Sequence, residues 1–229
     1  MIKLIVFDLD GTLIDSLPSI NFALDSALTG VGYPAAGPDK TRRWIGNGSD
    51  VLVARGLSDS QTIDPALPSD LLQRARGIFN DAYQNAGHAH DLIYPDVAET
   101  LGFFAKQGYK MAVLTNKTEC FIEPLLVHFG IAQFFEYTIA GNTLPERKPS
   151  PMGLHWLCDK YQFTMDEVVM VGDSENDINA AQAAGCQSVG LTYGYNYDVP
   201  IASANPTFVI DKFAQLRDLP LFEPALVSV

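Results

Sequence analysis

The segment Lys3-Leu-Ile-Val-Phe-Asp-Leu-Asp-Gly-Thr-Leu13 is the stretch that best indicates the fold. From Lys3 to Asp8 it is a continuous apolar, β-branched run, which is typical of a strand buried on both faces of a parallel sheet. The run ends in two carboxylates, Asp8 and Asp10, and then in Gly11, which allows the backbone to turn sharply. We therefore predict a buried first strand that carries acidic side chains at its carboxyl end.

Similar short apolar runs recur along the chain, and helical patterns lie between them. The runs are 110–115, 136–140, 167–172, 186–191 and 207–210, and the helical patterns are 96–108, 121–129, 151–161 and 177–184. Alternating strands and helices predict an α/β fold with a doubly wound, mostly parallel, Rossmann-like sheet.

The stretch between the first strand and the remaining alternation has a different pattern. It contains helix-like segments at 19–28, 40–44, 49–57 and 71–83, separated by glycines and prolines, and no convincing strand. We interpret it as an inserted α-helical cap. The predicted division is a core of residues 1–14 and 86–229 and a cap of residues 15–85.

Composition limits the classes of partner. The chain has 229 residues, 47% hydrophobic and 18% charged, with a formal net charge of -12. That acidic balance argues against nucleic acid and against an anionic membrane surface as partners. Three cysteines without CxxC spacing (Cys120, Cys158 and Cys186) fit a reducing compartment, and no apolar run approaches the roughly 18 residues of a membrane span. We expect a cytoplasmic protein, of an oligomeric state that the sequence leaves open.

Polar side chains follow several of the predicted strands, where open α/β sheets bind their ligands. Besides Asp8 and Asp10 these are Thr115, Asn116, Lys148, Asp173 and Asp177. Clustered carboxylates repel one another, and a hard divalent cation such as Mg²⁺ relieves that repulsion. We predict that Asp8 and Asp173 bind Mg²⁺ through their side chains and Asp10 through its backbone carbonyl. Asp177 is either a further ligand or a residue behind the ligands.

The same residues predict phosphoryl transfer. Asp8 would attack the phosphorus and form an aspartyl-phosphate, while Asp10 would act as general acid and then as general base. The phosphate would be held by Thr115, Asn116, Lys148 and the backbone N–H of Gly11. Lys117 is expected to point into the next helix and to have no catalytic role.

These residues carry a family resemblance over essentially the whole chain. Asp8-Leu-Asp-Gly-Thr-Leu13, Leu114-Thr-Asn-Lys117, Lys148-Pro149 and Gly172-Asp-Ser-Glu-Asn-Asp177 resemble the four motifs of the haloacid-dehalogenase superfamily, in order. The helical insert is similar to that superfamily's first type of cap. The match is closer to the phosphoglycolate phosphatase family at 42–48, 94–97, 188–196 and 208–213. This resemblance implies Mg²⁺-dependent hydrolysis of 2-phosphoglycolate or a similar small phosphomonoester.

The cap offers candidate substrate residues. Arg43 lies three residues before Gly46, where related capped families place a substrate-facing arginine or lysine, and an arginine can bind a small anion bidentately. The alternative is a surface arginine. Gly46-Asn47-Gly48 is either a substrate-facing loop or a turn between two helices.

Two other functions use the same residues. A phosphosugar mutase would pass the phosphoryl group to a second sugar hydroxyl, so that an isomer accumulates instead of phosphate. A non-catalytic phosphoacceptor module would keep the phosphate on Asp8 without turnover, although such a module does not need Asp10.

Overall fold

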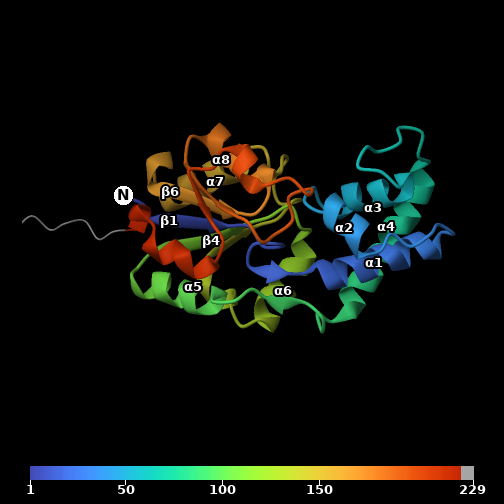
Figure 1. Cartoon of the computed structure of the whole chain (residues 1–229), viewed down its shortest axis with the longest axis horizontal. Helices are drawn as coiled ribbons and strands as arrows, with labels where there is room; N and C mark the ends of the chain where they lie inside the picture. The colour runs from blue at the N-terminus through green and yellow to red at the C-terminus, as the bar shows by residue number, and fades with distance from the viewer. Residues whose placement is uncertain (223–229) are drawn as a thin grey trace, which may run out of the picture.

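The computed structural model describes residues 1–222 and contains a six-stranded sheet of order β5-β4-β1-β6-β7-β8, in which every pairing is parallel. The strands are β1 (Leu4–Phe7), β4 (Lys110–Leu114), β5 (Tyr137–Ile139), β6 (Val168–Gly172), β7 (Gln187–Leu191) and β8 (Phe208–Ile210). The predicted α/β fold with a mostly parallel sheet is confirmed (Figure 1).

Helices cover both faces of this sheet (Figure 1). α5 (Val97–Lys106) and α6 (Ile122–His128) pack on one face, and α7 (Met152–Tyr161) and α8 (Glu175–Ala184) on the other. Short 3-10 turns complete the core: η1 (Glu119–Phe121), η2 (Ala132–Phe134), η3 (Met165–Glu167), η4 (Ile201–Ala204), η5 (Phe213–Asp218) and η6 (Pro220–Phe222).

Strand β1 shows why its sequence is apolar throughout. Leu4 and Val6 face the α7–α8 layer, Ile5 and Phe7 face the α5–α6 layer, and all four are fully buried. Burial stabilises each such side chain by about 1.5–3 kcal/mol. Because β1 lies between β4 and β6, its carboxyl end is in the middle of the sheet edge.

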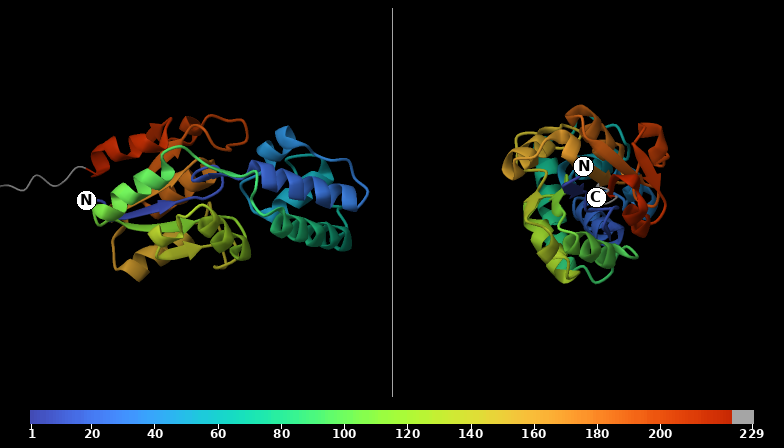
Figure 2. Two further views of the ribbon diagram at one scale, coloured as in Figure 1. Left: turned by 90° about the horizontal axis from the view of Figure 1, so that it is seen from below. Right: turned by 90° about the vertical axis from the view of Figure 1, so that its left-hand side faces the viewer.

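A small two-stranded ribbon was not predicted. β2 (Ile14–Asp15) pairs antiparallel with β3 (Leu92–Ile93), with Ile14 opposite Ile93. Two-residue strands are too short to show a periodic pattern. The ribbon ties together the two crossings of the chain between the sheet and the helical segment, which Figure 2 shows as thin connections.

The inserted segment folds into four helices beyond the carboxyl ends of the strands (Figures 1 and 2). They are α1 (Leu17–Gly30), α2 (Pro38–Trp44), α3 (Ser49–Ser58) and α4 (Ser69–Ala86). We call this group the helical body. Its apolar core includes Leu24, Leu28 and Phe79 and is joined by Phe121 from the loop after β4. No helix within residues 1–222 has the length and apolar character of a membrane span.

Candidate active site

Three buried carboxylates meet at the edge of the sheet. Asp8 follows β1, Asp173 follows β6, and Asp177 lies in the first turn of α8. Because Phe7 pairs with Val171, the ends of β1 and β6 are adjacent. Each residue has a carboxylate oxygen within 4.8 Å of one from the other two.

Lys148, from the loop after β5, lies against two of these acids. Its Nζ is 2.8 Å from Asp8 Oδ1 and 2.6 Å from Asp177 Oδ1. Burial alone would lower the pKa of Lys148, but Asp177 and Asp8 raise it above the ordinary value of a lysine. The predicted Lys148 is therefore a permanent positive charge beside Asp8.

Asp173 is held from both sides. Its Oδ1 accepts a hydrogen bond of 2.6 Å from Thr12 Oγ1, and its Oδ2 accepts one of 2.6 Å from the backbone N–H of Tyr195. Burial, then the charges of Asp8 and Asp177, raise the pKa of Asp173 well above the ordinary range. Burial likewise raises the pKa of Asp177 to about 7, against the opposing effect of Lys148.

Asp10 forms a second ion pair, with Lys117. Lys117 Nζ lies 2.9 and 3.1 Å from the two carboxylate oxygens of Asp10, and Ser16 Oγ donates to Oδ1 at 2.5 Å. The expectation that Lys117 points into the following helix is wrong. Its side chain, only 6% exposed, turns back toward β1 because Asp10 offers the charge that a buried ammonium requires.

The donor set fits a divalent cation. Six largely buried charged groups meet here, four carboxylates and two ammonium groups, so their formal charge is -2: Asp8, Asp10, Asp173, Asp177, Lys117 and Lys148. Asp8 Oδ1 is buried and accepts no well-aligned hydrogen bond within residues 1–222, although the Lys148 ammonium is near. Oxygen ligands with excess negative charge suit Mg²⁺. Asp177 belongs to the same cluster of carboxylates, and its two oxygens contact the Lys148 ammonium and the Ser174 N–H.

The predicted phosphate-binding residues lie at the same edge but differ in what they can donate. Thr115 Oγ1 accepts from the N–H of Lys117 at 3.2 Å, which leaves its hydroxyl proton free to donate. Asn116 Nδ2 donates to the carbonyls of Gly46 and Lys148, at 2.8 and 2.9 Å. The side chain of Asn116 therefore ties a loop of the helical body to the loop that carries Lys148.

Gly11 does not offer its N–H to a ligand. That N–H donates to the carbonyl of Ile14 at 2.8 Å, which corrects the prediction that it binds phosphate. Glycine is required here for two other reasons: φ is +89°, and a Cβ would overlap the Asp173 carboxylate. Within residues 1–222, the N–H groups of Leu9 and Asp10 make no hydrogen bond, so they are the backbone donors next to Asp8.

A small cavity of about 60 Å³ lies between this edge and the helical body. The core side contributes Asp8, Asp10, Thr115, Asn116, Lys117, Thr118 and Phe121, and the helical body contributes Ile20, Ile45, Gly46, Gly48, Ser49, Leu52, Phe79 and Tyr83. Charged groups therefore lie at the sheet end of the cavity, and the helical body contributes mostly apolar walls.

The structure separates the predicted residues of the helical body. Gly46 and Gly48 line the cavity, whereas the Asn47 side chain accepts a hydrogen bond from Tyr197 at 2.9 Å. Arg43 does not reach the cavity: it is 51% exposed, donates to the Asp39 carbonyl and lies 3.4 Å from Asp198. The substrate-facing alternative for Arg43 is thus not supported, because its position in α2 directs it to solvent.

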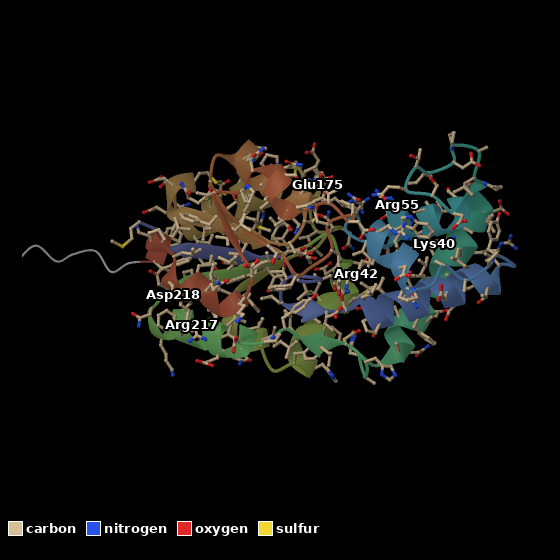
Figure 3. The ribbon with its side chains drawn as sticks, in the orientation of Figure 1. Lys40, Arg42, Arg55, Glu175, Arg217 and Asp218 are labelled. Carbon is tan, nitrogen blue, oxygen red and sulfur yellow. The ribbon has the colours of Figure 1, made fainter. Side chains whose placement is uncertain are left out.

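Neighbouring arginines take part in the contact between the two bodies. Arg42 donates to the Gly194 carbonyl at 3.2 Å and lies over the Tyr195 ring, and Arg55 lies over the Tyr197 ring. Figure 3 shows Arg42 and Arg55 on the part of the helical body nearest the sheet domain.

Sequence reasoning assigned no role in this site to four residues that the structure places there: Thr12, Lys117, Tyr83 and Tyr195. Thr12 directly follows the segment 8–11, and Lys117 directly follows Asn116. Their position next to predicted site residues could therefore have indicated them. Tyr83 and Tyr195 come from distant segments that only the tertiary fold brings to the strand ends.

Comparisons with known proteins agree with this architecture. Residues 5–191 match the family described as haloacid dehalogenase-like hydrolase. A phosphoglycolate phosphatase of Vibrio cholerae is 48% identical over 220 residues, which cover 96% of this chain and 97% of the relative. One from Pseudomonas putida is 44% identical, over 93% of this chain and 78% of the relative.

Solved structures are similar over the whole chain as well. A protein of Haemophilus somnus, described as a predicted phosphoglycolate phosphatase, has a TM-score of 0.89 at 40% identity and covers 95% of this chain and 97% of its own. CbbY from Rhodobacter sphaeroides, in complex with phosphate, has a TM-score of 0.77 at 25% identity, with 94% and 96% covered.

The class that the fold, the site and these matches define is a hydrolase of phosphoric monoesters. The chain belongs to the haloacid dehalogenase-like hydrolase family, which confirms the resemblance stated from its four motifs. The relatives named above are described as phosphoglycolate phosphatases, and their similarity to this chain extends over nearly its full length.

Proposed function

We propose that this chain hydrolyses 2-phosphoglycolate in a Mg²⁺-dependent reaction with an aspartyl-phosphate intermediate. The observation that carries the proposal is the position of Asp8. It lies at the centre of the sheet edge, 2.8 Å from the Lys148 ammonium, within 4.8 Å of two further carboxylates and at the end of a small cavity. The full-length similarity to phosphoglycolate phosphatases supports the choice of substrate.

In the first step, a carboxylate oxygen of Asp8 attacks phosphorus and the ester P–O bond breaks. Lys148 offsets the repulsion between the two anions, and the Thr115 hydroxyl and the N–H groups of Leu9 and Asp10 bind phosphoryl oxygens. Asn116 would contribute its backbone N–H, since its side chain is engaged elsewhere.

Asp10 is the proposed proton carrier. It gives a proton to the departing glycolate alkoxide, and then takes one from the water that attacks the aspartyl-phosphate. This second attack releases inorganic phosphate and restores the Asp8 carboxylate. Lys117 holds the Asp10 carboxyl group in place through contacts of 2.9 and 3.1 Å.

Mg²⁺ would be held by the side chains of Asp8 and Asp173 and by the backbone carbonyl of Asp10. When bound, it supplies positive charge for the phosphoryl oxygens. Asp177 would not contact the substrate. It would hold the ammonium of Lys148 in place through a 2.6 Å contact.

We also propose the division into a core of residues 1–14 and 86–229 and a cap of residues 15–85. The helical body closes one side of the cavity, and its removal would expose Asp8 to bulk water.

The free thiols of Cys120, Cys158 and Cys186 support the proposed cytoplasmic location.

The test is phosphate release from 2-phosphoglycolate with Mg²⁺ and with a chelator, beside sugar phosphates, nucleotides and p-nitrophenyl phosphate. We expect release that needs Mg²⁺ and is fastest with 2-phosphoglycolate. Phosphate release only from another ester would support the proposed mechanism and refute 2-phosphoglycolate as the substrate. An isomer in place of phosphate would indicate a mutase, and phosphoprotein that does not turn over would indicate a phosphoacceptor module.

A further inference from the structure

The cavity contains a positive charge, on Lys117, that contacts Asp10 but that the proposed chemistry pairs with no group of the substrate. Of the residues that line the cavity, all within the described part of the chain, Lys117 alone is cationic. It lies beside Asp10, whereas Lys148 lies behind Asp8. A phosphoryl group bound at Asp8 would therefore have a second ammonium close to the organic part of the ester.

We infer that Lys117 and Tyr83 form a subsite for the carboxylate of a short phosphorylated carboxylic acid, an inference that rests on the proposed phosphatase function. Lys117 supplies the charge and Tyr83, from α4 of the helical body, supplies a hydroxyl donor. Lys117 Nζ is 4.5 Å from the centre of the Tyr83 ring, so the two groups face the same part of the cavity.

Lys117 retains a donor for a ligand. An ammonium has three N–H donors, and the contacts of Lys117 with Asp10 leave room for a further acceptor. The contact with Asp10 pairs the Lys117 ammonium inside the protein, and its positive charge can stabilise a buried substrate carboxylate that would otherwise lose its hydration without compensation.

The Tyr83 hydroxyl is the second observation. Tyr83 is 1% exposed and lines the cavity, and its hydroxyl has no well-aligned hydrogen-bond partner within residues 1–222, although the Lys117 ammonium is near. A buried polar group without a partner is destabilising unless a ligand or water satisfies it. Burial also raises the pKa of Tyr83, so that the hydroxyl keeps the proton it would donate.

Distance along the substrate supports this location. Asp10 must reach the ester oxygen to protonate it, and Lys117 is in contact with Asp10. In 2-phosphoglycolate a single methylene separates the ester oxygen from the carboxylate. A carboxylate so close to that oxygen would lie beside Lys117, the cationic neighbour of Asp10 that lines the cavity. The hydroxyls of Ser49 and Thr118, 3.4 Å apart, line the same cavity and add polar contacts.

The experiment compares kcat/KM for 2-phosphoglycolate with kcat/KM for ethyl phosphate, which has the same two carbons but no carboxylate. The variants are Lys117→Met and Tyr83→Phe. We expect the ratio of the two constants to fall about 10- to 100-fold for Lys117→Met and by a smaller factor for Tyr83→Phe. The loss for 2-phosphoglycolate should lie mainly in KM.

Two matched variants serve as controls. Lys106→Met removes an exposed lysine at the end of α5. Tyr161→Phe removes a buried hydroxyl that likewise has no well-aligned hydrogen-bond partner within residues 1–222 but lies on α7, outside the cavity. Neither should change the ratio. Tyr83→Phe keeps the ring that stacks on Phe79, so it remains informative if Lys117→Met does not fold.

The outcomes separate this inference from the proposed function. If the wild type shows no preference for 2-phosphoglycolate over ethyl phosphate, the proposed substrate fails. If the wild type shows the preference and both variants retain it, the subsite inference is overturned. An equal loss on both substrates would also overturn it, because Lys117 would then act only through Asp10 and the fold.

Discussion

Asp8 is buried at the end of the fully buried strand β1, and the Lys148 ammonium lies 2.8 Å from its carboxyl group. Because burial reduces screening by solvent, charges in contact here interact more strongly than they would at the protein surface.

Replacement of Asp8 tests this assignment. Asp8→Asn keeps the shape of the side chain but removes the proposed nucleophile, so we expect kcat to fall at least about 1,000-fold. The measurement is phosphate release under saturating Mg²⁺ and substrate. Asp218→Asn is the control, because Asp218 is exposed at the end of the molecule remote from the helical body (Figure 3). A Mg²⁺-dependent activity near the wild-type value would refute the nucleophile.

The ionised carboxylate of Asp173 should lower the free energy of unfolding of the metal-free protein. Its folded-state pKa is raised, by burial first and by Asp8 and Asp177 next, so the unfolded chain loses this proton at lower pH than the folded chain does. Stability is therefore fully present below the ordinary aspartate pKa of about 3.9 and is lost as pH rises through the raised value. Asparagine does not titrate, and it can bond both the Tyr195 N–H and Thr12 Oγ1.

We therefore expect Asp173→Asn to raise the Tm measured in chelator near pH 7 by about 2 °C or more. The gain should shrink toward pH 4, and the Tm increase that Mg²⁺ gives the wild type should disappear. Thermal melts at several pH values, with chelator and with Mg²⁺, provide the measurement. A lower Tm of the variant in chelator near pH 7 would show that the carboxylate stabilises the metal-free fold.

At the residue scale, adjacency to a strand end is what sequence could detect. Asp8, Asp173 and Lys148 all follow predicted strands, and the structure brings them together. The N–H of Gly11 was predicted incorrectly because the sequence does not show that the carbonyl of Ile14 accepts its proton. Tyr83 lies on an amphipathic helix, where an aromatic residue is typical of apolar packing, so no local signal distinguished it.

At the scale of elements, α8 connects stability with chemistry. Ser174 is its N-cap: its Oγ accepts from the Asn176 N–H at 3.3 Å, and its own N–H donates to Asp177 at 3.0 Å. This capping box fixes the first turn of α8 and, with it, the carboxylate that holds Lys148. The N-cap of α8 therefore helps to position Lys148, which lies on another loop.

Ser174→Ala removes half of this box. We expect the free energy of unfolding to fall by about 1 kcal/mol, with a modest fall in kcat, since the backbone N–H that contacts Asp177 remains. Urea denaturation and steady-state kinetics measure the two effects. Ser203→Ala, at an exposed position in η4, should change neither. An unfolding free energy equal to that of the wild type would contradict the capping role.

The elements themselves were largely predictable where packing repeats along the chain. Both faces of β1, β4 and β6 are covered, so continuous apolar runs marked these strands. The β2–β3 ribbon was not predicted, because it pairs residues that are far apart in sequence and includes only two positions in each strand. The helical segments of the insert were predicted within a few residues, since each presents apolar positions to a shared core.

At the scale of the whole molecule, the cavity exists only where the helical body meets the sheet edge. Besides the apolar contact of Phe121, the junction has polar contacts: Arg147 lies 2.9 and 3.2 Å from the two oxygens of Asp50, and Asn116 bonds the Gly46 carbonyl. The partly exposed Arg147–Asp50 pair is weak on its own, which is compatible with the hypothesis that the helical body opens to admit substrate.

The Arg147–Asp50 pair tests whether this junction governs substrate binding. Burial opposes the charge of Asp50, yet Arg147 holds the pKa of that carboxyl below its ordinary value. The pair is therefore intact above the ordinary aspartate pKa of about 3.9 and is lost only as pH falls through the lowered value. Between pH 5 and 8 its effect should not vary with pH.

Arg147→Met leaves Asp50 in the first turn of α3, where a negative charge is favourable, and removes only the link between the two bodies. Both side chains are about one-third exposed, so the pair should contribute no more than about 1 kcal/mol. We expect KM to rise about 2- to 5-fold at low salt, because the closed arrangement becomes less populated, and the difference from wild type to shrink in 0.5 M NaCl. Lys110→Met, which breaks the exposed Lys110–Glu136 pair within the core, is the matched control. An equal rise in KM for the control, or no salt dependence for Arg147→Met, would show that this ion pair does not hold the helical body over the site.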